Sequence, residues 1–276
     1  MSAQASLVSE LFRYRGLLGM LAWRDIRVRY KQSVLGVAWA FLMPLVQTAV
    51  FVAIFHYSGA LKVSESGLHG MPYILFVLSA IIPWTLFNGT VASSLECLTR
   101  NSRLVTKIYF PREVFPLSNV VAALVDFGVA LAVFLPIYAY FVATSPNVHV
   151  TPALLLYPVV VVIQVLFIAG LSMLLSMANL FFRDVKYIMT FVLQLWFFAT
   201  NVVYPITFDR SPHLQWISYV NPMIPILNAY RDILQGNGIH HSTPAGLISA
   251  AVISIVTFVI GWRVFHKASF KFAEYV

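Results

Sequence analysis

The sequence predicts an all-α membrane protein with six transmembrane helices and both termini in the cytoplasm. Hydrophobic residues make up 60% of the 276 residues and charged residues only 10%, whereas soluble domains carry roughly 25% charged residues. Six apolar stretches are long enough to cross a bilayer, which takes about 20 residues. Only three of the 18 Lys and Arg residues, Lys62, Arg210 and Arg231, fall in segments that this topology places outside, as expected if basic residues stay in cytoplasmic loops.

Residues 1–33 precede the first span and predict an amphipathic helix over residues 7–32 that lies in the membrane interface. Its apolar side chains share one arc of a helical wheel: Leu7, Leu11, Tyr14, Leu18, Leu21 and Val28. Its basic residues suit contact with lipid headgroups: Arg24, Arg27, Arg29 and Lys31. Asp25 falls on the apolar arc, and we expect Arg29, four residues further on, to pair with it.

The predicted transmembrane domain covers residues 34–265. Its six spans are residues 34–57, 71–94, 117–142, 153–180, 188–204 and 246–265. Between the last two spans, residues 205–245 combine prolines with apolar stretches that are too short to cross a bilayer. Because such segments are expected to dip into the interface and return, we expect one or two short re-entrant helices on the outer side. Residues 266–276 form a basic cytoplasmic tail.

The basic loop, residues 95–116, joins the second and third spans. Its four basic residues alternate with apolar ones: Arg100, Arg103, Lys107 and Arg112. This pattern predicts a short amphipathic helix over residues 98–108 at the cytoplasmic face. Pro111 then disfavours helical structure at Phe110. Two interpretations remain open, since the loop can anchor the topology or can dock a cytosolic partner.

The chain lacks the common motifs of catalysis. It has no Gly-Lys step and therefore no phosphate-binding P-loop, and it has no GxSxG or His-Glu-x-x-His motif. The single cysteine, Cys97, cannot form an internal disulfide, and the adjacent pair His240 and His241 does not share a helix face. We therefore expect neither an enzyme nor a metal or cofactor site. The net charge of +8 follows from membrane topology, and we expect no nucleic-acid partner.

Asp126 is the one acidic residue well inside a predicted span. An ionisable group at this depth is costly and indicates a function or a specific partner. A proton relay, a helix–helix hydrogen bond and the lining of a polar path all fit, and the hydrogen bond is favoured because a proton carrier usually needs more than one such group.

Aromatic residues are frequent near the predicted outer side. Five of them are candidates for a path on which sugar rings stack: Trp196, Tyr204, Trp216, Tyr219 and Tyr230. The alternative is an aromatic belt at the membrane interface, which explains most of them without a ligand.

Four stretches carry a resemblance to a known family. They are WRDIRVRY at 23–30, NSRLVTK at 101–107 with FPRE at 110–113, FRDV at 182–185, and NPM at 221–223 with Tyr230 and Arg231. Their order and spacing resemble the membrane subunits of ABC-2-type exporters of bacterial polysaccharides, which carry O-antigen, capsule or teichoic acid. The segment RVRYKQSVLG is most similar to the O-antigen branch.

This resemblance implies a multi-pass protein of the bacterial inner membrane. Two copies of the chain would assemble with two copies of a separate ATPase, which would bind ATP and Mg. The cargo would be a glycan on a polyprenyl diphosphate lipid. The basic loop would couple to the ATPase through seven residues: Arg100, Asn101, Arg103, Leu104, Lys107, Phe110 and Arg112. A capsule or teichoic-acid permease remains the alternative. A proton-coupled transporter that uses Asp126 is the alternative of another class.

Overall fold

The chain folds into a bundle of helices. A computed structural model describes residues 14–31, 33, 35–58, 68–107, 111–205, 215–236, 243–270 and 272. The elements are α2 (Arg15–Tyr30), η1 (Gly36–Ala38), α3 (Trp39–Tyr57), α5 (Tyr73–Leu95), α6 (Cys97–Arg100), α7 (Ser102–Lys107), α8 (Val114–Thr144), η3 (Pro152–Leu156), α9 (Tyr157–Phe181), α10 (Val185–Phe198), α11 (Trp216–Val220), α12 (Met223–Gln235) and α13 (Pro244–Ser269). The described residues form helices and turns only, which confirms the predicted all-α class.

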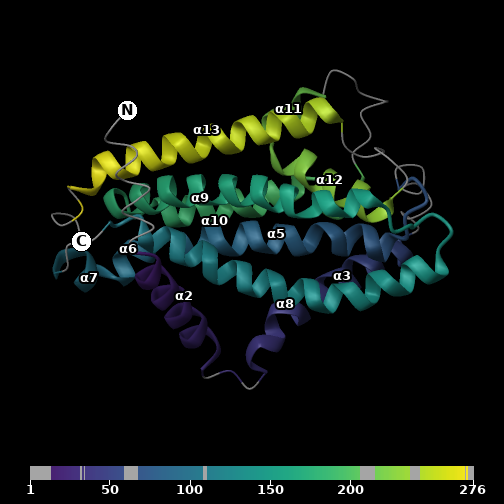
Figure 1. Ribbon diagram of the computed structural model, residues 1–276, viewed down its shortest axis with the longest axis horizontal. Coiled ribbons are helices and arrows are strands. Elements are labelled where there is room, and N and C mark those ends of the chain that lie inside the picture. The colour runs from purple at the N-terminus through teal and green to yellow at the C-terminus, as the bar shows by residue number, and fades with distance from the viewer. Residues whose placement is uncertain are drawn as a thin grey trace.

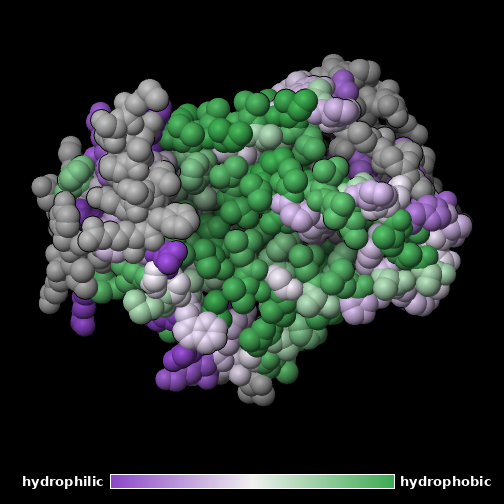
Figure 2. All heavy atoms as spheres, in the orientation of Figure 1, coloured by the Kyte–Doolittle hydropathy of each residue, from purple (hydrophilic) through white to green (hydrophobic). Residues whose placement is uncertain are grey.

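The long helices lie side by side, with α13 along one side of the bundle and α3 on the other (Figure 1). α5 is the central helix, because 78% of its most apolar stretch is buried in the protein, against 11% for the helix over Gly36–Tyr57. Figure 2 shows a broad apolar band across the middle of one face, with polar residues gathered toward the two ends. This distribution fits a bundle whose lateral surface meets lipid.

Five helices of the described chain are long and apolar enough to cross a membrane: Gly36–Tyr57, Tyr73–Leu95, Val114–Thr144, Pro152–Phe181 and Pro244–Ser269. They correspond to five of the six predicted spans. The predicted span over residues 188–204 differs, because its helix, α10, has 14 residues and ends at Phe198. At 1.5 Å per residue this helix is about 21 Å long, shorter than a bilayer core.

The segment after α10 nevertheless continues along the length of α5. Lys186, at the start of α10, pairs with Glu96 at the last turn of α5. The carbonyl of Val202 and that of Phe76, near the first turn of α5, both accept from Arg231. Residues 200–203 are buried. Non-helical backbone is tolerated within a bilayer only where protein surrounds it, and residues 200–203 meet that condition.

The segment 205–245 contains the short helices α11 and α12. Every residue of α12 is buried, and the helix lies at the end of the bundle away from α2 and α7 (Figure 1), called here the opposite end. Gly236 ends α12 in the left-handed conformation at φ 78°, with its N–H bonded to the Asp232 carbonyl at 3.1 Å. A Cβ at Gly236 would lie 2.1 Å from the His149 carbonyl oxygen, so only glycine fits there.

α9 and α13 contact each other at two glycines, Gly170 and Gly261. A Cβ at Gly170 on α9 would lie 2.5 Å from backbone atoms of Thr257 and Phe258, and a Cβ at Gly261 on α13 would lie 2.5 Å from the Gly170 carbonyl oxygen. Small residues let two membrane helices approach closely, which maximises their van der Waals contact. This crossing closes one side of the bundle.

The other end of the bundle, called here the basic end, has a small apolar core of its own. Six helices contribute buried side chains to it: Leu21 of α2, Leu98 of α6, Val105 of α7, Phe115 of α8, Leu180 of α9 and Phe265 of α13. The N-terminal helix, the basic loop and the end of the last helix are therefore packed as one unit.

Candidate functional site

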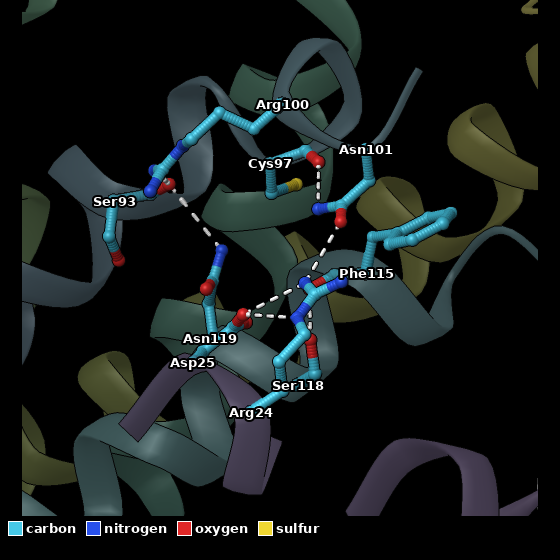
Figure 3. Close-up of polar contacts among 9 residues, drawn as sticks. All are labelled: Arg24, Asp25, Ser93, Cys97, Arg100, Asn101, Phe115, Ser118 and Asn119. Carbon is cyan, nitrogen blue, oxygen red and sulfur yellow. Dashed lines mark hydrogen bonds and ion pairs between the residues drawn. The ribbon is translucent and has the colours of Figure 1, made fainter. Parts of the chain in front are cut away.

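The basic loop begins where α5 ends, and polar side chains satisfy the carbonyls that the end of a helix leaves without intrahelical partners. The Arg100 guanidinium donates to the Ser93 carbonyl at 2.7 Å, and the Asn119 amide of α8 donates to the same oxygen at 3.4 Å (Figure 3). The Asn179 amide of α9 donates to the Leu95 carbonyl at 2.8 Å. Three helices thus hold the end of α5 in place.

Asn101 divides the basic loop. The sequence predicts one helix over residues 98–108, but the structure has two, α6 and α7, with a break at Asn101. The Asn101 amide donates to the Cys97 carbonyl at 2.7 Å, and its carbonyl oxygen accepts from Arg24 at 2.9 Å (Figure 3). Asparagine side chains compete in this way with backbone hydrogen bonds and interrupt helices. The Asn101 side chain at this break therefore connects the basic loop to α2.

The end of the basic loop is tied to the end of α13. Arg112 donates to the Ser269 carbonyl, and its guanidinium lies 6.0 Å from the Phe272 ring centre. The buried carboxylate of Glu113 lies 2.7 Å from Nδ1 of His266. The loop is therefore in contact with the end of α13 as well as with α5.

The remaining predicted coupling residues differ in their placement. Arg103 is exposed, and Leu104 packs against the small core of the basic end. Lys107 is described in its backbone alone, and Phe110 lies outside the described residues.

Glu96 links the basic loop to α10. Its carboxylate pairs with Lys186, and Arg100 lies 3.9 Å away. The hydrogen bond from Lys186, with the positive charges of Lys186 and Arg100, lowers the pKa of Glu96 below its ordinary value of 4.5, although partial burial opposes this. Lys186, the residue directly after the FRDV segment, is thus in direct contact with the basic loop.

The four predicted headgroup residues, three on α2 and Lys31 directly after it, differ in their contacts. Arg24 bonds to Asp25 and Asn101, the Arg27 guanidinium lies 5.5 Å from the Trp23 ring centre, and Lys31 is exposed. The expected pair between Asp25 and Arg29 is wrong, because Asp25 pairs with Arg24 and Arg29 pairs with Asp126 of α8. Sequence spacing favoured the local pair, whereas packing of α2 on α8 brings a carboxylate from a distant segment to Arg29.

The apolar face of α2 is also narrower than predicted. Leu21 is buried and Leu18 packs beside it, but Val28 is 70% exposed. Residues 7–13 of the predicted helix lie outside the described residues.

Asp126 accepts two hydrogen bonds from α2. Arg29 donates to its Oδ2, and the Tyr30 hydroxyl donates to its Oδ1 at 2.7 Å. Burial and the hydrogen bond to Asp126 raise the pKa of Tyr30 to about 12, so its hydroxyl keeps its proton at neutral pH. The helix–helix hydrogen bond, one of three roles that the sequence left open, is present.

The predicted aromatic residues are spread between surface and core. Trp216 and Tyr219 on α11 are exposed, while the Trp196 indole donates to the Asn221 side chain at 3.0 Å. The Tyr204 hydroxyl donates to the Phe198 carbonyl. Tyr230 is fully buried on α12, where its hydroxyl donates to Gln164 at 2.8 Å. In this conformation Tyr230 supports packing, and Trp216 and Tyr219 are the rings that face outward.

Arg231 was counted from the sequence as an outer-loop charge, yet it is fully buried. Its guanidinium donates to the carbonyls of Asn201 at 2.6 Å and Val202 at 2.9 Å, and it lies 3.6 Å from the Phe76 ring centre. Its position in a mainly apolar stretch, residues 223–234, where Asn228 and Asp232 are the other strongly polar residues, was the signal that could have indicated burial.

The comparisons with known proteins agree with this architecture. The model of the ABC-2 type transporter family matches residues 16–234. This chain belongs to that family. It is 34% identical to the O-antigen export system permease protein RfbA of Myxococcus xanthus over 97% of this chain and 98% of that protein. Identity to the RfbA protein of Klebsiella pneumoniae is 27%, over 94% of both chains. The polysialic acid transport protein KpsM of Escherichia coli is 22% identical over 88% of this chain and 90% of its own length.

Membership in the ABC-2 family and the five long apolar helices make the chain a multi-pass inner-membrane transport protein. The match covers the whole basic loop and nearly all of α2 and α12, whereas α13, which carries His266 and Ser269, lies beyond it.

Proposed function

We propose that this chain is the permease subunit of an ABC transporter that exports a lipid-linked polysaccharide of the O-antigen type across the bacterial inner membrane. The observation that carries the proposal is the 34% identity to an O-antigen export permease over nearly the full length of both chains. A separate ATPase subunit supplies the energy, since the sequence has no P-loop.

We infer that the basic end faces the cytoplasm and that the basic loop docks the ATPase. Cytoplasmic loops are rich in Lys and Arg, and Arg100 and Arg103 are exposed at this end. Contacts from the loop to α2, α5, α8 and α13 give it a mechanical connection to most of the bundle. α10 with residues 199–204 forms the sixth crossing, and both termini are cytoplasmic.

We propose that a second copy of the chain completes the path for the polymer. α3 and α10 each expose a row of large apolar side chains: Met43, Val46, Val50 and Ile54 on α3, and Tyr187, Phe191, Leu195 and Phe198 on α10. These faces suit lipid or a second subunit. Trp216 and Tyr219 at the opposite end offer rings to sugars that leave the path.

The alternatives have less support. A capsule permease is the second candidate, and the relative named for polysialic acid transport is 22% identical. A proton carrier would need a carboxylate that is free to exchange protons, whereas Asp126 is held by Arg29 and Tyr30.

The proposal is tested by co-expressing the chain with ATPases of its own genome and measuring glycan export in cells. We expect one ATPase to co-purify and to be stimulated by lipid-linked glycan. Arg103→Glu should reduce co-purification by about tenfold through charge repulsion, while the matched variant Lys267→Glu, exposed at the same end on α13, should leave it unchanged. Glycan transport by this chain alone in liposomes would refute the proposal.

A further inference from the structure

A cavity opens on the side of the bundle between α2, α3, α5 and α8. Its volume is about 620 Å³, and the residues that line it include Arg29, Tyr30, Trp39, Met43, Gly89 and Asp126. In Figure 1, α2 runs away from the bundle and α3 returns to it, so the two helices form a V whose open side faces α5 and α8. The cavity lies inside this V.

The walls of the cavity are unequal. The end of α2 and the middle of α8 bring one arginine, one phenol and one carboxylate together. The rest is mostly apolar, with Trp39, Met43 and Pro44 on α3, and its polar side chains are the hydroxyl residues Ser33, Thr85, Thr90 and Ser93. α5 is buried along most of its surface, yet Thr85, Gly89 and Ala92 are exposed along the cavity. A site with one polar end and one apolar body suits an amphiphile.

The polar end is open to a ligand. The side chains of Arg29 and Asp126 are 38% and 20% exposed, so the pair is not sealed into the protein. A guanidinium has five donors in a planar fork and binds phosphate oxygens as well as carboxylate oxygens. An anionic headgroup that enters the cavity can therefore take the place of the Asp126 carboxylate on Arg29.

We propose that this cavity binds the diphosphate end of an isoprenoid lipid, with Asp126 as an internal competitor for Arg29. The choice of this lipid rests on the proposed function, whereas the site rests on the geometry. Without ligand, Asp126 compensates an arginine that would be costly to leave uncompensated beside the membrane. When the headgroup is bound, the Tyr30 hydroxyl continues to donate to Asp126, and the apolar chain lies against α3 and α5.

The competition predicts effects of opposite sign for the two partners of one ion pair. The full-length protein in phosphatidylcholine nanodiscs is titrated with farnesyl diphosphate. Arg29→Gln should weaken binding by about tenfold, because a charge-assisted contact is lost. Asp126→Asn should tighten it by about threefold, because the competitor loses its charge. Arg15→Gln is the matched control, because Arg15 is an exposed arginine of the same helix that does not line the cavity, and it should bind like the wild type.

A second variant tests the apolar part without touching the pair. A Cβ added at Gly89 would meet no heavy atom within 4 Å, and Gly89 lines the cavity, so we expect Gly89→Leu to fold, to fill part of the cavity and to weaken binding by about fivefold. Farnesol, inorganic pyrophosphate and phosphatidylglycerol are the competitors, and we expect each to displace the ligand poorly.

Three results would overturn the inference. Weaker or unchanged binding by Asp126→Asn means that the pair is only structural. Wild-type binding by Arg29→Gln or Gly89→Leu places the ligand elsewhere. Equal displacement by phosphatidylglycerol or by pyrophosphate means a general site for anionic lipid or free phosphate. Since no ATPase or transport is involved, a failure of the proposed function is detected separately in the export assay.

Discussion

Arg231 and Arg29 lie on different sides of α5 and are held in opposite ways. Arg231 is fully buried and donates to main-chain carbonyls of Asn201, Val202 and Phe76. Arg29 is partly exposed beside a cavity and pairs with a single carboxylate, that of Asp126.

The difference shows which charge is available to a ligand. Several carbonyls fixed by the fold surround Arg231, so its removal leaves buried acceptors without donors. Arg29 faces the Asp126 carboxylate on another helix and an open space. Another anion can therefore replace that carboxylate on Arg29 at little cost to the fold. Helix packing differs in the same way. α9 and α13 pack closely at Gly170 and Gly261, whereas the cavity separates part of α3 from α5.

The largest expected effect is at the enclosed arginine. Arg231→Leu should destabilise the protein by about 3–5 kcal/mol, because buried polar partners lose their donor. Thermal unfolding of the purified protein in detergent measures this loss. Arg231→Lys keeps the positive charge but loses the planar guanidinium, so its stability should lie between that of Arg231→Leu and that of the wild type. If Arg231→Leu were as stable as the wild type, the buried carbonyls around Arg231 would not depend on its guanidinium.

The glycine crossing should give the next largest effect. Gly170→Ala places a methyl group 2.5 Å from backbone atoms of α13, and overpacking of this kind costs about 1–3 kcal/mol. Gly128→Ala on α8 is the matched control, since a Cβ there meets nothing within 4 Å. The same unfolding assay compares them, and equal stabilities would mean that the crossing is looser than described.

The open pair should have a smaller effect on stability. Asp126→Asn keeps the shape of the side chain and a carbonyl that can accept from Tyr30, so we expect a loss of about 1 kcal/mol. The thermal shift should be well below that of Arg231→Leu. If the two losses match, the pair at the cavity is as enclosed as Arg231, and the contrast between them is wrong.

The smallest expected effect is at Glu96, whose partner Lys186 is exposed. Because the folded protein lowers the pKa of Glu96, its contribution to stability is present above the ordinary value of 4.5 and is lost as the pH falls through the lowered pKa. Stability measured between pH 7 and pH 3 should therefore decline slightly less in Glu96→Gln than in the wild type. An equal decline would mean that the pair contributes nothing.

Much of this protein could be predicted from the order of its residues, because lipid imposes a strict rule. A chain that cannot hydrogen-bond to its solvent must form helices across it, so apolar stretches of sufficient length identify the spans and the basic residues indicate their orientation. The motifs at 23–30 and 101–107 also indicated the family before any contact was known.

Only the tertiary structure decided which charges meet. Asp126 and Arg29 are 97 residues apart, and a wheel drawn on α2 alone assigned Arg29 to Asp25. The burial of Arg231, the break at Asn101 and the shortness of α10 have the same origin, since each depends on side chains and carbonyls from distant segments. Hydropathy follows from the local chain and its solvent, whereas the partner of a buried polar group is set by packing.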